Sequence, residues 1–228
     1  MERIYDCSKD TDLLTGMRLA KVAIGRKELV VVPTDTVYGL AADAFSPEAV
    51  QKLLDAKGRG RQSPPPVLIG NISALEGLAH EVPAIAHKLA EVFWPGALTM
   101  ILKSQPSLTW DLGETKGTVA LRMPDHKIAL ALLQETGPLA VSSANLTGEP
   151  AAITAAQAEG YLGASCSVYL DGGPSPKGEA STIIDLTDLV ESVDEAGQVQ
   201  VTGKVKIVRL GALSEVKLKS VLGDLLEA

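Results

Sequence analysis

Residues 29–40 read LVVVPTDTVYGL, a short β-branched run that ends in a cluster of polar side chains. The run Leu29–Val32, followed by Pro33, is typical of a buried strand. Two hydroxyls, a carboxylate and a phenol come next, and ligands of open α/β sheets bind where strands end. The same cluster also fits a loop in which Asp35 and the threonines bond the local backbone. The spacing alone leaves both interpretations open.

Outward from this stretch, apolar runs alternate with helical patterns along the chain. Ser46-Pro47 offers an N-cap with proline at the first helical position, which predicts a helix to about Lys57. Fully apolar strands between helices are typical of an α/β or mixed α+β sheet covered by helices. Further strands are predicted over residues 67–69, 97–102, 118–122, 139–141, 167–170, 182–186 and 199–209. Further helices are predicted over residues 73–80, 83–93, 126–135 and 154–162.

We expect a single domain over residues 1–228. The chain has 228 residues, 46% of them hydrophobic and 21% charged, which is ordinary for a globular protein with a real core. The acidic segment 187–200 predicts a surface hairpin or insertion, and Ser214 is expected to cap a C-terminal helix within residues 213–228. The polar N-terminus does not resemble a signal peptide, and no stretch approaches 18 uninterrupted apolar residues. These features predict a cytoplasmic protein with no membrane partner.

Composition argues against several classes of function. The net charge of −7 disfavours a protein whose main function is to bind double-stranded nucleic acid through its phosphates. Aromatic residues, at 4%, are too scarce for a surface on which single-stranded bases stack. The histidines His80, His87 and His126 and the cysteines Cys7 and Cys166 lack metal-ligand spacing, so no metal site is predicted. Phosphate-loop, dinucleotide-binding and nucleophile-elbow motifs are absent from the sequence.

Three further polar clusters are candidates for a binding site. Residues 57–61, KGRGR, either complement a helix dipole or form an anion clamp, and their two glycines favour the clamp. Residues 141–148, VSSANLTG, suit either a pocket for a polar metabolite or a capped turn. The Gly-rich segment 171–182 brings hydroxyls into a strand. Arg122, at the end of a strand, suits either a substrate carboxylate or a surface ion pair.

Together these segments resemble the YrdC family, the threonylcarbamoyl-AMP synthases of tRNA modification. They occur in the family's order and cover nearly the whole chain. The matching segments are PTDTVYGLAADA (33–44), AKGRG (56–60), FWPGALTMIL (93–102), TVALRMPDH (118–126), SSANLTG (142–148), LDGG (170–173), EASTIIDLT (179–187) and VRLG (208–211). The resemblance implies a twisted, largely parallel or mixed sheet with helices around a deep concave cavity, in the short form with one domain.

The resemblance also implies a reaction. L-Threonine, bicarbonate or CO2, and ATP would give L-threonylcarbamoyladenylate and pyrophosphate, with Mg²⁺ bound mainly through ATP. A partner tRNA threonylcarbamoyltransferase complex would then modify adenosine 37 of tRNAs that read ANN codons, and a direct tRNA contact is a further expectation. Two alternatives remain: a module of the same fold that binds tRNA or double-stranded RNA without turnover, and a relative that handles another carbamoylated adenylate, as in hydrogenase maturation.

Site roles follow from the resemblance, residue by residue. The implied catalytic residues are Lys57 and Arg59. The implied threonine-binding residues are Thr34, Arg122, Ser143 and Ser181. The implied ATP-binding residues are Lys57, Arg59, Ser63, Thr118, Asn145, Thr154 and Arg209. Tyr38 is expected to form a wall of the pocket. The chain departs from the family pattern at residues 60–66, GRQSPPP, where the histidine that usually lies near the threonine is absent.

Overall fold

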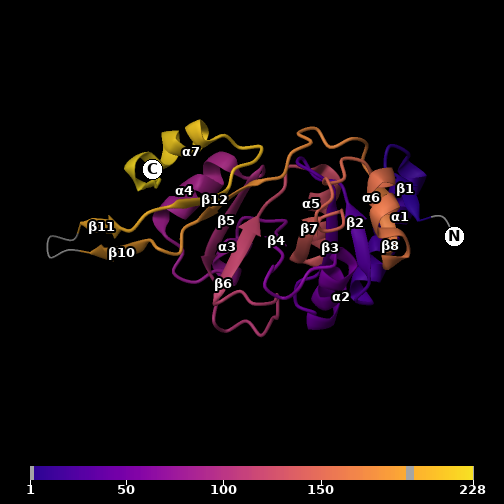
Figure 1. Cartoon of the computed structure of the whole chain (residues 1–228), viewed down its shortest axis with the longest axis horizontal. Helices are drawn as coiled ribbons and strands as arrows, with labels where there is room; N and C mark the ends of the chain where they lie inside the picture. The colour runs from indigo at the N-terminus through magenta and orange to yellow at the C-terminus, as the bar shows by residue number, and fades with distance from the viewer. Residues whose placement is uncertain (1–2, 194–197, 228) are drawn as a thin grey trace.

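A mixed ten-stranded sheet organises the molecule, for which a computed structural model describes residues 3–193 and 198–227. The strand order is β1-β8-β2-β3-β7-β4-β6-β5-β9-β12, with both parallel and antiparallel neighbours. The predicted α/β fold with a mixed sheet is therefore confirmed (Figure 1). Its strands are β1 (Ile4–Asp6), β2 (Leu29–Val32), β3 (Gly39–Asp43), β4 (Val67–Leu68), β5 (Leu98–Lys103), β6 (Thr118–Arg122), β7 (Leu139–Ser143), β8 (Cys166–Asp171), β9 (Thr182–Asp185) and β12 (Lys206–Arg209).

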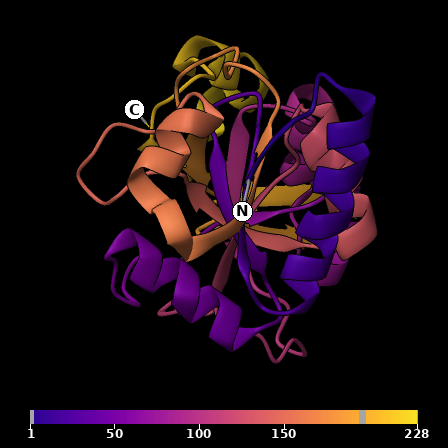
Figure 2. The ribbon, with the colours of Figure 1, turned by 90° about the vertical axis from the view of Figure 1, so that its right-hand side faces the viewer.

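Helices cover both faces of this sheet, as the end-on view in Figure 2 shows. Apolar residues of α1 and α5 pack against one face of β2, and those of α2 and α6 pack against the other. The remaining helices α3, α4 and α7 pack around β5, β6 and β9. The α-helices are α1 (Asp10–Gly25), α2 (Pro47–Lys57), α3 (Ala74–Leu78), α4 (Ala84–Phe93), α5 (Lys127–Thr136), α6 (Ala155–Leu162) and α7 (Glu215–Leu222).

Local sequence explains how the elements next to the polar clusters begin and end. The Ser46 hydroxyl accepts a hydrogen bond from the Ala49 N–H and so caps α2, as predicted, and Gly58 ends that helix with a left-handed φ of 63°. Strand β3 pairs antiparallel with β7, where Gly39 faces Ser143. A Cβ on Gly39 would lie 2.6 Å from the Val141 Cγ1, so only glycine permits this close pairing.

The alternation of side chains along β6 separates its functional face from its core face. Val119 and Leu121 are buried in the apolar core that β6 shares with α3, α4 and α7. Thr118, Ala120 and Arg122 occupy the alternate positions and line a cavity. The two-residue period therefore places Thr118 and Arg122, at the two ends of β6, on the face of the strand that lines the cavity.

The structure differs from the sequence prediction in several elements. Strands β1 and β3 and helix α1 were not predicted. The single strand expected over residues 199–209 is two strands, β11 (Val199–Thr202) and β12, because Gly203 between them takes a φ of 90°. Ser214 does occupy the N-cap position of α7, but its side chain makes no capping hydrogen bond.

The acidic segment 187–200 forms most of an exposed two-stranded hairpin that ends at Thr202. Strand β10 (Val190–Val193) pairs antiparallel with β11, and every residue of both strands is exposed. In Figure 1 the hairpin projects from the end of the molecule opposite β1. Residues 194–197 of the predicted insertion, like residues 1–2 and 228 at the chain ends, lie outside the described residues. After α7, the 3₁₀-helix Gly223–Leu225 follows. None of the helices in the described residues is both long and apolar enough to span a membrane.

Candidate active site

A cavity of about 280 Å³ opens where the polar strand ends converge. Its walls combine hydroxyls and guanidinium groups with small apolar side chains. Of the residues predicted for the site, Thr34, Arg59, Thr118, Arg122, Ser143, Ser181 and Arg209 line this cavity, together with Tyr38. Segments from six strands or strand ends therefore meet in one hollow, although they are far apart in the sequence.

The segment Thr34–Tyr38 forms one wall and is fixed by its own hydrogen bonds. The Thr34 hydroxyl donates to the Val37 carbonyl (2.6 Å) and accepts from the Thr36 N–H (3.2 Å). The Tyr38 hydroxyl donates to the Gly173 carbonyl at 2.6 Å, and burial raises the pKa of that phenol well above its usual range. Both sequence interpretations of this cluster thus apply, because the side chains that bond the local backbone also line the cavity.

Arg122 is held in the cavity wall by an almost completely buried network. Its Nη2 donates to the Asp35 carboxylate (2.5 Å), its Nη1 to the Thr36 hydroxyl (2.9 Å) and its Nε to the Gly96 carbonyl (2.8 Å). A guanidinium has five N–H groups, so two remain for a ligand in the cavity. Their fixed fork geometry suits a carboxylate.

Asp35 is only 3% exposed and belongs to the same network. Its carboxylate also accepts from the Lys177 ammonium (2.7 Å) and the Asp125 N–H (3.0 Å). Burial by itself raises the pKa of Asp35, but the charges of Arg122 and Lys177 and these hydrogen bonds together hold it below its ordinary value. Asp35 is therefore ionised and fixes the plane of the Arg122 guanidinium.

Arg59 and Arg209 line a second part of the wall, and their hydrogen bonds to described residues go to neutral oxygens. Arg59 donates to the hydroxyls of Thr147 (3.2 Å) and Ser142 (3.3 Å). Arg209 donates to the Ser181 carbonyl through both Nη2 (2.7 Å) and Nε (3.1 Å). Burial, and then the positive charge of Arg59, lower the pKa of Arg209. Within residues 3–193 and 198–227 neither arginine has a carboxylate partner among the ion pairs.

Lys57 lies behind the cavity wall rather than in it. The residue is 1% exposed, and its ammonium donates to the carbonyls of Ser143 and Asn145. Burial, and then the charge of Arg59, lower the pKa of Lys57 to about 8. Because Ser143 is itself a lining residue, Lys57 sets the position of the 143–145 turn and adds a positive charge beneath it.

The other three predicted ATP-binding residues lie outside the cavity lining. Asn145 is buried in its turn, where its amide donates to the carbonyls of Leu146 (2.9 Å) and Glu149 (2.6 Å). The Thr154 hydroxyl caps α6 by accepting from a backbone N–H. Ser63 precedes the lining run Pro64–Pro66, and its backbone N–H donates to the Gly60 carbonyl. Their contacts with ATP remain predictions.

Several residues at the site were not predicted from the sequence. Thr99 lines the cavity, and its hydroxyl lies 2.8 Å from that of Ser181. The only feature of the sequence that could have indicated Thr99 is its hydroxyl within the otherwise apolar run of residues 98–102. Thr36 and Asp35 stood within the quoted polar run, but nothing in the sequence pairs them with a distant arginine. The proline run Pro64–Pro66 lines the wall in the segment that departs from the family pattern.

The lining chemistry favours anionic ligands and does not resemble a resident metal site. In the part of the chain that the structure describes, no group of three or more acidic, histidine or cysteine side chains is placed to hold a metal ion. Guanidinium groups and hydroxyls surround the hollow instead, which suits phosphates and carboxylates. Fold and cavity together thus define an α/β protein with a concave cavity at the ends of its strands, lined by groups suited to anions.

Comparison with known proteins shows which family the chain belongs to. The pattern of the Sua5/YciO/YrdC family, described as telomere recombination, matches residues 22–195. A Mycobacterium leprae protein, to which threonylcarbamoyl-AMP synthase activity is provisionally assigned, is 49% identical over 88% of this chain and 91% of its own length. The Bacillus subtilis threonylcarbamoyl-AMP synthase is 37% identical over 90% of this chain and 56% of its own length. The chain belongs to the Sua5/YciO/YrdC family.

Solved structures agree with this assignment. Pyrococcus abyssi Sua5 in complex with L-threonine superposes with a TM-score of 0.86 at 32% identity, over 99% of this chain. The chain spans 62% of the length of that protein. Escherichia coli YciO has the same fold, with a TM-score of 0.76 at 22% identity. The expected mixed sheet of this family is thereby confirmed.

Proposed function

We propose that this chain is a threonylcarbamoyl-AMP synthase. It would convert L-threonine, bicarbonate or CO2, and ATP into L-threonylcarbamoyladenylate and pyrophosphate. The relatives that carry this name support the proposal. The observation that carries it in the structure is the pairing of two anion sites in one cavity. Arg122 offers two N–H groups beside a buried carboxylate, and Arg59 and Arg209 offer charges without an acidic partner.

The amino-acid side of the cavity would hold threonine through its carboxylate. We assign that contact to the two remaining N–H groups of Arg122, with the hydroxyls of Thr34, Ser143 and Ser181 around the substrate. The threonine ammonium group first loses a proton to water, and the resulting amine attacks CO2. A C–N bond forms as one C=O π bond opens, and a second proton passes from nitrogen to water to give the carbamate. The Thr34 hydroxyl already donates to a main-chain carbonyl, so it is placed to accept rather than to act as a nucleophile.

The phosphate side would align ATP for attack. A carbamate oxygen forms a bond to the α-phosphorus while the bond from that phosphorus to the pyrophosphate oxygen breaks. We assign Arg59 and Arg209 to the phosphates, Thr118 to the nucleotide and Lys57 to positioning of the 143–145 turn. Because both reactants are anionic, these cations offset their repulsion and stabilise the charge that develops in the transition state. Mg²⁺ would enter as Mg·ATP, held by phosphate oxygens and water.

Later steps extend the proposal beyond this chain. The adenylate would pass to a tRNA threonylcarbamoyltransferase complex in the cytoplasm, for modification of adenosine 37 in tRNAs that read ANN codons. A direct tRNA contact is part of the same proposal. The alternative of an RNA-binding module without turnover is less well supported, because Arg59, Arg122 and Arg209 all line one cavity in a protein of net charge −7.

Pyrophosphate release tests the proposed reaction. The protein is incubated with Mg·ATP, bicarbonate and each amino acid in turn, and the adenylate is identified by mass spectrometry. We expect release with L-threonine and little without bicarbonate. Arg59→Ala should lower the rate by about 100-fold, the usual range for loss of one charge-stabilising donor. Arg26→Ala, which removes an exposed arginine outside the cavity, is the matched control. Release that is independent of threonine, or equal rates in both variants, would contradict the proposal.

A further inference from the structure

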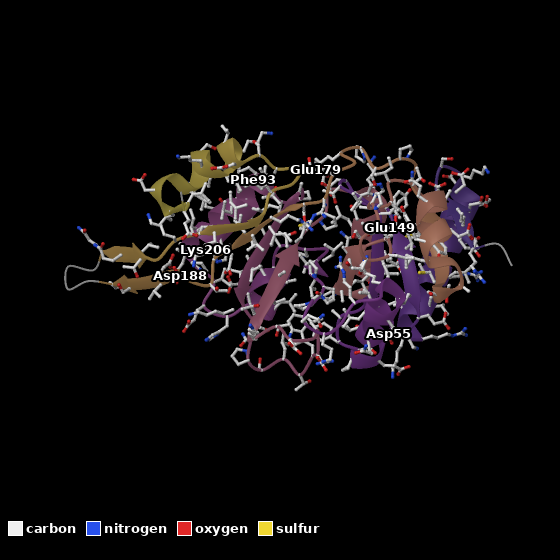
Figure 3. The ribbon with its side chains drawn as sticks, viewed as in Figure 1. Asp55, Phe93, Glu149, Glu179, Asp188 and Lys206 are labelled. Carbon is white, nitrogen blue, oxygen red and sulfur yellow. The ribbon has the colours of Figure 1, made fainter. Side chains whose placement is uncertain are left out.

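The loop at residues 172–180 is fastened to the segment Thr34–Tyr38 at both of its ends. At its start, the Gly173 carbonyl accepts from the Tyr38 hydroxyl. Near its end, Lys177 contacts Asp35 twice, through its ammonium on the carboxylate (2.7 Å) and through its N–H on the carbonyl (3.3 Å). Ala180, three residues after Lys177, lines the cavity. Glu179 of this loop lies at the upper side of the molecule in Figure 3 and is exposed.

Lys177 changes the charge that a ligand meets at Arg122. The buried pair of Arg122 and Asp35 is neutral in sum, so an incoming carboxylate would gain little from it at longer range. Lys177 supplies a second positive charge to the other carboxylate oxygen of Asp35. The three groups together carry a net charge of +1. The Lys177 side chain is 39% exposed and is not among the lining residues of the cavity. Its charge would therefore reach a ligand only through Asp35 and Arg122.

Other charged groups around Asp35 do not replace Lys177. Asp125 contributes only its backbone N–H to the carboxylate and is otherwise exposed. Burial lowers the pKa of His126, so that imidazole is neutral near pH 7 and adds no positive charge. Burial, and to a smaller extent the nearby charge of Arg209, lower the pKa of the Arg122 guanidinium, but the guanidinium of Arg209 is itself bonded to Ser181 and not to Asp35 in the described part of the chain. Among these groups, Lys177 is therefore the one that supplies a positive charge to the Asp35 carboxylate oxygen that Arg122 does not contact.

We propose that Lys177 is a positioning residue that neutralises Asp35, so that Arg122 keeps its positive charge available for the carboxylate of the amino-acid substrate. The inference rests on the proposed function and adds a determinant of amino-acid affinity to it. Lys177 does not touch the substrate. It acts through Asp35 and Arg122, and the same contact holds the end of the loop that leads to Ser181.

Three substitutions separate the charge of Lys177 from its hydrogen bond. Lys177→Arg keeps both, Lys177→Gln keeps a donor without charge, and Lys177→Met keeps neither. We expect the KM for L-threonine to rise roughly tenfold in Lys177→Gln and Lys177→Met, as expected when one charge is removed a few ångströms away. The KM for ATP should stay unchanged, and Lys177→Arg should restore threonine affinity. Lys103→Met, which breaks an exposed ion pair with Glu81 outside the cavity, is the control.

A second measurement needs no substrate. The titration of the Asp35 carboxyl, followed by NMR, should shift to higher pH in Lys177→Gln but not in Lys177→Arg. If the wild-type protein releases no pyrophosphate with threonine, the proposed function fails, whereas this titration still shows whether Lys177 neutralises Asp35. A wild-type KM for threonine in Lys177→Gln, or an Asp35 titration that does not move, would overturn the inference and leave Lys177 as a fastener of the loop.

Discussion

At one part of the cavity wall Arg122 is bonded to the buried carboxylate of Asp35. At another part, Arg59 and Arg209 are bonded, within residues 3–193 and 198–227, only to neutral oxygens. The first arrangement fixes a cation in one orientation and ties it to the folded state. The second leaves like charges close together, as the effect of Arg59 on the pKa of Arg209 shows. The fold therefore supplies a charge partner for Arg122 by itself, whereas Arg59 and Arg209 would gain one only from an anionic ligand.

Removal of Arg122 should give the largest loss of stability. Arg122→Leu leaves Asp35 buried with only the half-exposed Lys177 as a charge partner, and loss of one partner of a buried pair costs about 3–5 kcal/mol. We expect that reduction in the free energy of unfolding, measured by urea denaturation at pH 7.

The double variant Arg122→Leu with Asp35→Leu should recover part of the loss, because no buried charge then remains unpaired. Arg59→Ala should change the free energy of unfolding little, since it removes a cation that has no acidic partner. Equal losses in Arg122→Leu and Arg59→Ala would show that the two sides of the cavity do not differ in this way.

Anion binding should stabilise the second side of the cavity. Pyrophosphate at 100 times its Kd is expected to add about 2.7 kcal/mol to the stability of the folded state. For a chain of this size that corresponds to a rise in Tm of roughly 5–10 °C. Thermal denaturation with and without pyrophosphate measures the shift.

The double variant Arg59→Ala with Arg209→Ala is the informative comparison for this measurement. Its Tm should respond only weakly to pyrophosphate, because both cations without acidic partners are gone. An undiminished rise in that variant would place the anion site elsewhere in the molecule.

The pKa of Lys57, lowered to about 8, predicts a pH dependence of ATP affinity. A bound anion favours the charged ammonium, so ATP binding raises the pKa of Lys57 and takes up a proton near pH 8. Affinity is therefore full below pH 8 and falls above it, by at most tenfold per pH unit for one proton. Calorimetric titration with ATP alone, between pH 7 and 9.5, measures this fall. In Lys57→Met the affinity above pH 7.5 should be lower and flat, and an equal fall in that variant would assign the titration to another group.

The sequence predicted the strands and helices that carry their own signals, but not the long-range pairing of their ends. Leu29–Val32 is apolar and β-branched, and Ser46-Pro47 marks a helix start, so both elements followed from local chemistry. Strand β3 was missed because Gly39–Asp43 reads GLAAD, which has little β-propensity and is held as a strand by β2 and β7. The conformation of that segment is therefore set by its pairing with β2 and β7 and not by its own sequence.

The candidate site divides in the same way. A strand end rich in hydroxyls predicts a ligand site at Thr34, and a cation-rich helix end predicts an anion site at Arg59, because each pattern is local. The pairing of Arg122 with Asp35 joins segments 87 residues apart, and no periodicity encodes it. Lys57 was expected beside the phosphates, but its burial depends on how the 143–145 turn folds over it.

Thr154, for which the resemblance implies a contact with ATP, lies outside the cavity lining, and the effect expected there is the smallest. Its hydroxyl accepts from the Gln157 N–H at 3.2 Å, so Thr154→Ala should cost about 1 kcal/mol of stability through the lost helix cap. Ser214→Ala is the matched control, because Ser214 occupies the N-cap of α7 without a capping hydrogen bond and should cost less. If Thr154 only caps α6, the KM for ATP stays at the wild-type value in both variants. A KM for ATP raised severalfold in Thr154→Ala alone would extend the nucleotide site to the start of α6 and make the second side of the cavity larger than its lining residues indicate.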